Sequence, residues 1–111
     1  MQEYLLILKG DGMDDLSPDE LQQLLGDYKA WVSKLGDQYV TGQRLQSTGT
    51  LVPNKNTVIT DGPFLESKEI IAGFFLIKAK DQQHATAIAQ SSPHVGLYEI
   101  EVRPLVQPLM H

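Results

Sequence analysis

Cysteine is absent from the 111 residues of this chain, which excludes disulfide bonds, zinc–thiolate sites and a thiol nucleophile. Clusters of Lys and Arg are absent too, and the formal net charge is −5. Because nucleic-acid binding requires a basic face, we expect no nucleic-acid partner. The longest apolar run, residues 4–8, is too short to span a membrane, and residues 1–3 lack the pattern of a secretory signal. We therefore expect a cytoplasmic protein without a membrane partner.

The length and the ordinary composition predict a single soluble domain over residues 1–111. Hydrophobic periodicity and turn residues divide this domain into strands and helices. Ser17-Pro18-Asp19-Glu20 is the strongest local signal, since a Ser N-cap, a Pro at the first helical position and a Glu three residues after the cap begin a helix. The expected elements are a strand at 3–9, a helix at 18–35, a strand at 39–42, an irregular excursion at 45–55, a strand at 57–60, a strand at 70–78, a helix at 82–91 and a strand at 97–103.

The main elements follow the order β-α-β-β-α-β, which predicts an α+β ferredoxin-like fold with both helices on one face of an antiparallel sheet. The last strand alternates apolar and charged residues, so its second face carries Glu99, Glu101 and Arg103. The strand at 70–78 is apolar on both faces. A second copy that packs sheet to sheet would cover this mixed face, and we therefore predict a homodimer, a dimeric α/β barrel.

The turn Thr60-Asp61-Gly62-Pro63-Phe64 is the most informative stretch, because a dense set of charges follows it at Glu66, Lys68 and Glu69. Asp61 either caps the turn or lies at the mouth of a cleft. The charged set either faces a substrate or forms a solvated shoulder with weak ion pairs.

This stretch, together with Gly73 and the segment Ile100-Glu101-Val102-Arg103-Pro104, resembles the DGPF proteins of the YCII-related family. The resemblance covers nearly the whole chain and implies a ferredoxin-like fold that dimerises into an α/β barrel. Relatives on this fold include cofactor-free isomerases, dehydrochlorinases and monooxygenases, and some DGPF proteins are linked to alternative sigma factors. The YCII branch is expected to use a His–Asp pair with an early His. The first His here is His84, so that pair is not carried over.

His94 is the best candidate for a general base, because imidazole exchanges protons near neutral pH. The alternative is an exposed loop His without a chemical role. His84 is expected to face solvent. Asp61, Lys68 and Glu69 complete the predicted catalytic set.

The predicted substrate contacts are an aromatic group and a charged pair. Arg103 is expected to clamp an anionic substrate beside Glu101, or these two residues form an ion pair across the dimer interface. The aromatic contacts are Tyr4, Phe64 and Phe75.

No metal site or cofactor is expected. The acids Asp11, Asp14 and Asp15 lack the spacing of a calcium loop, and Gly10-Asp11-Gly12 lacks the full glycine pattern of a dinucleotide site. Two functional hypotheses remain. One is a cleft that binds a small organic molecule and transfers a proton without a cofactor. The other is a non-catalytic interaction protein, such as a partner of an alternative sigma factor.

Overall fold

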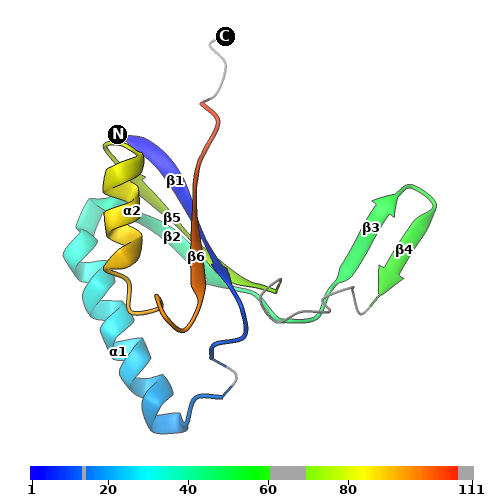
Figure 1. Ribbon diagram of the computed structural model, residues 1–111, viewed down its shortest axis with the longest axis horizontal. Coiled ribbons are helices and arrows are strands. Elements are labelled where there is room, and N and C mark those ends of the chain that lie inside the picture. Colours follow the sequence, from blue (N-terminus) through cyan, green and yellow to red (C-terminus); the bar gives the residue numbers. More distant parts are fainter. Residues whose placement is uncertain (14, 61–69, 108–111) are drawn as a thin grey trace.

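The computed structural model of the protein describes residues 1–13, 15–60 and 70–107. In this part, two α-helices pack against a four-stranded antiparallel sheet, and a two-stranded hairpin stands apart from it (Figure 1). The elements are β1 (Gln2–Lys9), α1 (Pro18–Leu35), a 3-10 turn (Gly36–Gln38), β2 (Tyr39–Arg44), β3 (Thr50–Asn54), β4 (Thr57–Thr60), β5 (Ile71–Ala79), α2 (Gln82–Gln90) and β6 (Glu99–Pro104).

The sheet has the strand order β2-β5-β1-β6, and each neighbouring pair is antiparallel. When the β3–β4 hairpin is set aside, the elements follow the order β-α-β-β-α-β. This finding confirms the predicted α+β class with a ferredoxin-like arrangement. It also makes β1 a central strand, with β5 on one side and β6 on the other.

The two faces of the sheet differ because side chains alternate along each strand. Leu6 lies opposite Phe75 of β5 and Val102 of β6. Leu6 and Phe75 belong to the core, and Val102 packs against it. The core between sheet and helices comprises Tyr4, Leu6, Leu8, Trp31, Phe75, Ile77, Ala79, Ala85, Ile88, Ala89 and Tyr98.

Helix α1 begins as the sequence predicts. The Glu20 backbone N–H donates to the Ser17 hydroxyl over 3.2 Å, and the Glu20 carboxylate accepts from the Ser17 backbone N–H over 3.0 Å. Leu24 and Trp31 are the buried side chains of α1, whereas Leu25 is 46% exposed.

Helix α2 is capped by Asp81, whose carboxylate accepts from the His84 backbone N–H over 2.8 Å. A hydrogen bond joins the two helices, because the Trp31 indole N–H donates to the Ser91 hydroxyl over 2.9 Å. Contrary to the expectation of a solvent-facing ring, His84 is half-buried, and its Nδ1 accepts from the Lys80 backbone N–H over 3.0 Å.

The segment 45–55 is not an irregular excursion throughout. Residues 50–54 form β3, which pairs with β4 in a hairpin of its own. This strand was not predicted, because the segment is polar and contains Gly and Pro. Strand propensity is a weak guide where two short strands pair mainly with each other. The large aliphatic side chains of the hairpin are exposed by 41–62%, and they are Leu51, Val52, Val58 and Ile59.

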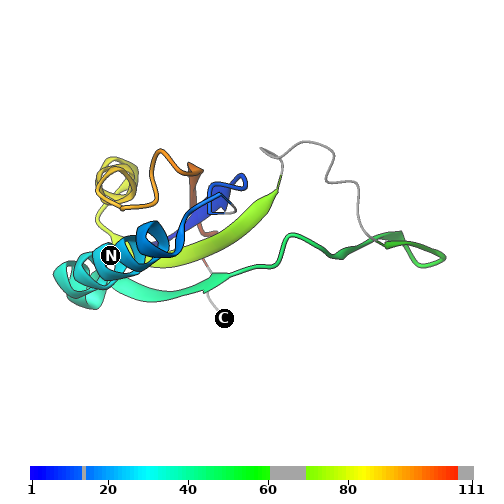
Figure 2. The ribbon, with the colours of Figure 1, turned by 90° about the horizontal axis from the view of Figure 1, so that it is seen from below.

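The second face of the sheet is uncovered by any helix of the described chain (Figure 2). Its apolar centre consists of half-buried side chains from the two middle strands, namely Leu5, Ile7, Phe74 and Leu76. At its β6 side, Glu101 forms ion pairs with Lys9 (3.2 Å) and Arg103 (3.1 Å). We call this surface the open face.

Candidate functional site

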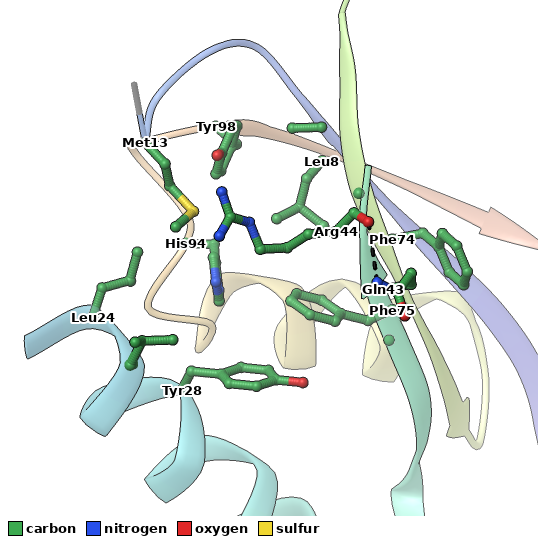
Figure 3. A pocket seen from close by; sticks show the side chains of 14 residues that line it. Leu8, Met13, Leu24, Tyr28, Gln43, Arg44, Phe74, Phe75, His94 and Tyr98 are labelled. Atoms are coloured by element: carbon green, nitrogen blue, oxygen red, sulfur yellow. Dashed lines mark hydrogen bonds between the residues drawn. The ribbon is translucent and has the colours of Figure 1, made fainter. Parts of the chain in front are cut away.

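A cavity of about 220 Å³ lies on the helix side of the sheet, between α1, the ends of β2 and β5, and the loop that follows α2 (Figure 3). We call it the inner cavity. Its lining residues are Leu8, Met13, Leu24, Leu25, Tyr28, Gly42, Gln43, Arg44, Ala72, Gly73, Phe74, Phe75, His94 and Tyr98.

Aromatic rings form much of the wall. The His94 ring packs edge-on against Tyr28 and Phe75, with centroids 5.6 and 5.2 Å apart, and stacks on Tyr98 at 6.4 Å. Tyr28 and Phe75 stack on each other at 5.6 Å. Such a wall offers flat apolar surface with ring edges and faces at defined orientations, which suits a planar organic molecule.

Gly42 lines the cavity at a position where no larger side chain fits. A Cβ at this position would lie 2.5 Å from the Tyr39 hydroxyl and 2.6 Å from the Phe75 ring. The Tyr39 hydroxyl is hydrogen-bonded to that of Tyr28. Burial first, and this hydrogen bond second, raise the pKa of Tyr39 well above its usual value. Tyr39 therefore remains protonated and acts as a hydrogen-bonding group, not as a base.

His94 is buried, with only 8% of its surface exposed. The Ser92 hydroxyl accepts from the His94 backbone N–H over 3.1 Å and is also hydrogen-bonded to the ring Nδ1 over 3.2 Å. Burial first, and the positive charge of Arg44 second, lower the pKa of His94 below its ordinary value of 6.5. The imidazole is consequently neutral at pH 7, the state in which it accepts a proton.

Arg44 is the last residue of β2, and its guanidinium is directed toward the same hollow as the His94 ring (Figure 3). It lies on the helix side because it pairs with Gly73, two residues from the Gly42–Phe75 pair. The ion pairs found among the described residues lie on the open face and do not include Arg44. The cavity thus combines a neutral base with a cation.

The predicted site residues that the structure describes fall into three groups. His94 and Phe75 line the inner cavity. Tyr4 is 2% exposed, belongs to the core and does not line the inner cavity. Glu101 and Arg103 lie on the open face, across the sheet from His94, and pair within one chain. The structure therefore does not bring them to His94.

The remaining predicted residues, Asp61, Phe64, Lys68 and Glu69, lie outside the described residues, and their roles stay predictions. Within the described ranges, no group of three or more His, Asp or Glu side chains is placed to hold a metal ion. Neither described helix has the length and apolar character of a membrane span.

Sequence reasoning missed Arg44, Tyr28 and Met13 as cavity residues. Tyr28 packs against the core from α1, and the cavity beside it leaves no signal in the hydrophobic periodicity of the helix. For Arg44 a signal existed. A strand extended by two residues beyond Gly42 places Arg44 on the same face as that glycine.

The fold and the site define a class of protein. It is an α+β protein of ferredoxin-like arrangement with an aromatic cavity beside its first helix. The family model of the YCII-related domain matches residues 11–107, and the chain belongs to this family. This confirms the family predicted from the sequence; the DGPF branch stays a prediction.

Two known proteins illustrate the relationship. An uncharacterized protein of Rhizobium meliloti (strain 1021) is 29% identical, over 83% of this chain and 82% of that protein. A solved structure, 5-chloro-2-hydroxyhydroquinone dehydrochlorinase (TftG) from Burkholderia phenoliruptrix AC1100 in complex with 2,5-dihydroxybenzoquinone, is similar with a TM-score of 0.53 and 14% identity. That match covers 96% of this chain and 95% of the other, and at this identity it concerns the fold.

Proposed function

We propose that this YCII-related protein binds a small organic molecule in the inner cavity and transfers a proton on it without a cofactor. The observation that carries the proposal is the pairing of a buried neutral imidazole with a guanidinium at one aromatic cavity. A neutral imidazole accepts a proton, and a nearby fixed cation stabilises the negative charge that the proton leaves behind.

The chemistry follows from these two groups. His94 removes a proton from a carbon beside a carbonyl, and the electron pair of the broken C–H bond moves to the carbonyl oxygen to give an enolate. Arg44 stabilises that oxyanion. Return of the proton to another atom of the enolate completes an isomerisation, whereas loss of a leaving group with its electron pair completes an elimination. TftG, named as a dehydrochlorinase, is an example of elimination on a similar fold.

The predicted residues of segment 61–69 are part of this proposal. Asp61, Lys68 and Glu69 would add polar groups to the site and Phe64 a further aromatic surface. They follow β4 along the chain and precede Ile70, which lines a second cavity together with Ala72, a residue of the inner cavity.

We further propose that two copies pack through their open faces to form a dimeric α/β barrel. An apolar centre of four half-buried side chains, with ion-paired charges at its β6 side, supports this assembly, because an unpartnered sheet face of that kind gains stability when it is covered. The ion-paired Glu101 and Arg103 would then lie at the edge of the interface.

A ligand screen tests the cavity. Purified protein is heated with small phenols, lactones and organic acids, and a compound that binds the native state raises the melting temperature with concentration. We expect a shift that is lost in Phe75→Ala and kept in Val95→Ala, since Val95 lies in the same loop as His94 but is 49% exposed.

Proton transfer is then measured on the compound that binds. In D2O, wild-type protein should catalyse the exchange of the compound's acidic carbon-bound hydrogens for deuterium. His94→Asn should bind the compound but should not catalyse this exchange. Equal exchange by His94→Asn would remove His94 as the base. Absence of any shift across the screen would reject the cavity as a binding site.

The exposed hairpin supports a second candidate, a non-catalytic interaction protein. Val52 and Val58 are 62% and 61% exposed, so β3 and β4 present apolar surface away from the sheet. If the screen fails, substitution of both valines by Thr tests this candidate. The variant should lose binding to an alternative sigma factor encoded in the same genome while its own melting temperature is retained.

A further inference from the structure

We propose that the ligand is an aryl monocarboxylate with a neutral hydrogen-bonding group beside its acid. The aromatic ring fills the inner cavity, the carboxylate binds Arg44, and the neutral group reaches a second, polar cavity. This inference rests on the proposed function, because it specifies what the inner cavity accepts.

The second cavity has a volume of about 340 Å³ and adjoins the first. We call it the outer cavity. Arg44, Ala72 and Tyr98 line both cavities, so Arg44 lies at their boundary. The wall of the outer cavity is more polar and includes Gln46, Ser47 and Thr48. A ligand that spans the boundary therefore meets rings on one side, a guanidinium at the middle and hydrogen-bonding side chains on the other.

The size of the inner cavity fits one substituted ring. A dry apolar cavity of about 150 Å³ is known to accept benzene, and the inner cavity measures about 220 Å³. The excess accommodates a short substituent that leads toward Arg44. Larger fused ring systems would exceed it.

The charges of the site select a monoanion. Arg44 is the cationic side chain among the described residues that line either cavity, and His94 is neutral at pH 7. One guanidinium matches one carboxylate, with which it forms two parallel hydrogen bonds. Asp11 lines the outer cavity, so a second anionic group there would meet like charge. The group beside the acid is therefore neutral, such as a hydroxyl or an amide.

Calorimetric titration with three probes tests this assignment. Phenylacetate carries the ring and the acid, 2-phenylacetamide replaces the acid by a neutral amide of similar shape, and mandelate adds a hydroxyl beside the acid. We expect phenylacetate to bind at least about tenfold more tightly than the amide, because a charge-assisted hydrogen bond is worth more than a neutral one. Mandelate should bind more tightly still, and Ser47→Ala should reduce that advantage.

Arg44→Gln should weaken phenylacetate at least about tenfold and leave the amide unchanged. Lys80→Gln is the matched control, since it removes the same charge from an exposed residue that follows the last residue of β5, whereas Arg44 pairs near the first. Equal binding of acid and amide by wild-type protein, or unchanged phenylacetate binding by Arg44→Gln, overturns the inference. Either result would leave the inner cavity as a binding site for small organic molecules. If neither probe binds, the inference is overturned, and the separate screen of phenols and lactones decides the proposed function.

Discussion

At the scale of single residues, His94 shows how a fold selects one protonation state. The ring is enclosed by Tyr28, Phe75 and Tyr98, and the Arg44 charge lies nearby. Both conditions disfavour imidazolium, the first through desolvation and the second through repulsion. The loop conformation holds the ring there, because the Ser92 hydroxyl binds both the backbone and the ring of His94.

This environment predicts how stability depends on pH. The pKa of His94 is lower in the folded chain than the 6.5 of a free imidazole, so the unfolded state binds more protons below that value. The contribution of neutral His94 to the free energy of unfolding is complete above pH 6.5, and it is lost as the pH falls through the pKa of His94 in the folded chain. We expect the free energy of unfolding, measured with urea between pH 7.5 and 5, to fall in wild-type protein. The fall should be smaller in His94→Phe and unchanged in Val95→Ala; identical profiles would contradict the assignment.

At the scale of elements, the same substitution should have opposite effects in a strand and in a helix. Gly26 lies within α1, and a Cβ added there would meet open space, so Gly26→Ala should raise the free energy of unfolding by about 0.5–1 kcal/mol. Gly42→Ala in β2 places a methyl group against Tyr39 and Phe75 and should lower it by about 1–3 kcal/mol. Urea denaturation of the two variants checks the sign of each effect. An unchanged free energy of unfolding in Gly42→Ala would show that Tyr39 and Phe75 can move to accommodate the methyl group.

The elements were predictable from the sequence where local signals are strong. The Ser17–Glu20 capping box fixes the start of α1, and the continuous apolar run over residues 70–77 marks the buried strand β5. The β3 strand was not predictable, because its stability depends on pairing with β4 and not on burial. The cavity was predictable only in part. Its His could be chosen by chemistry, whereas Arg44 could be found only by extending the strand at 39–42 two residues beyond Gly42, where it pairs with Gly73.

At the scale of the whole molecule, the open face predicts the state of association. Phe74→Glu would place a charge at the apolar centre of that face, and burial of an unpaired charge is strongly unfavourable. If the proposed dimer forms, light scattering should give twice the chain mass for wild-type protein and a lower mass for Phe74→Glu. Thr86→Glu on the exposed side of α2 adds the same charge and should retain the dimer. A wild-type monomer would reject the barrel.

The central position of β1 in the sheet has a consequence for how the protein folds during its synthesis. Its partners are residues 71–79 and 99–104, so the apolar segment 4–8 is synthesised long before either partner strand exists. Until then, this segment resembles an unpaired strand edge that can associate with other chains. The sheet can therefore assemble only after most of the chain has left the ribosome, and overexpression should demand more of chaperones than the small size of the protein suggests.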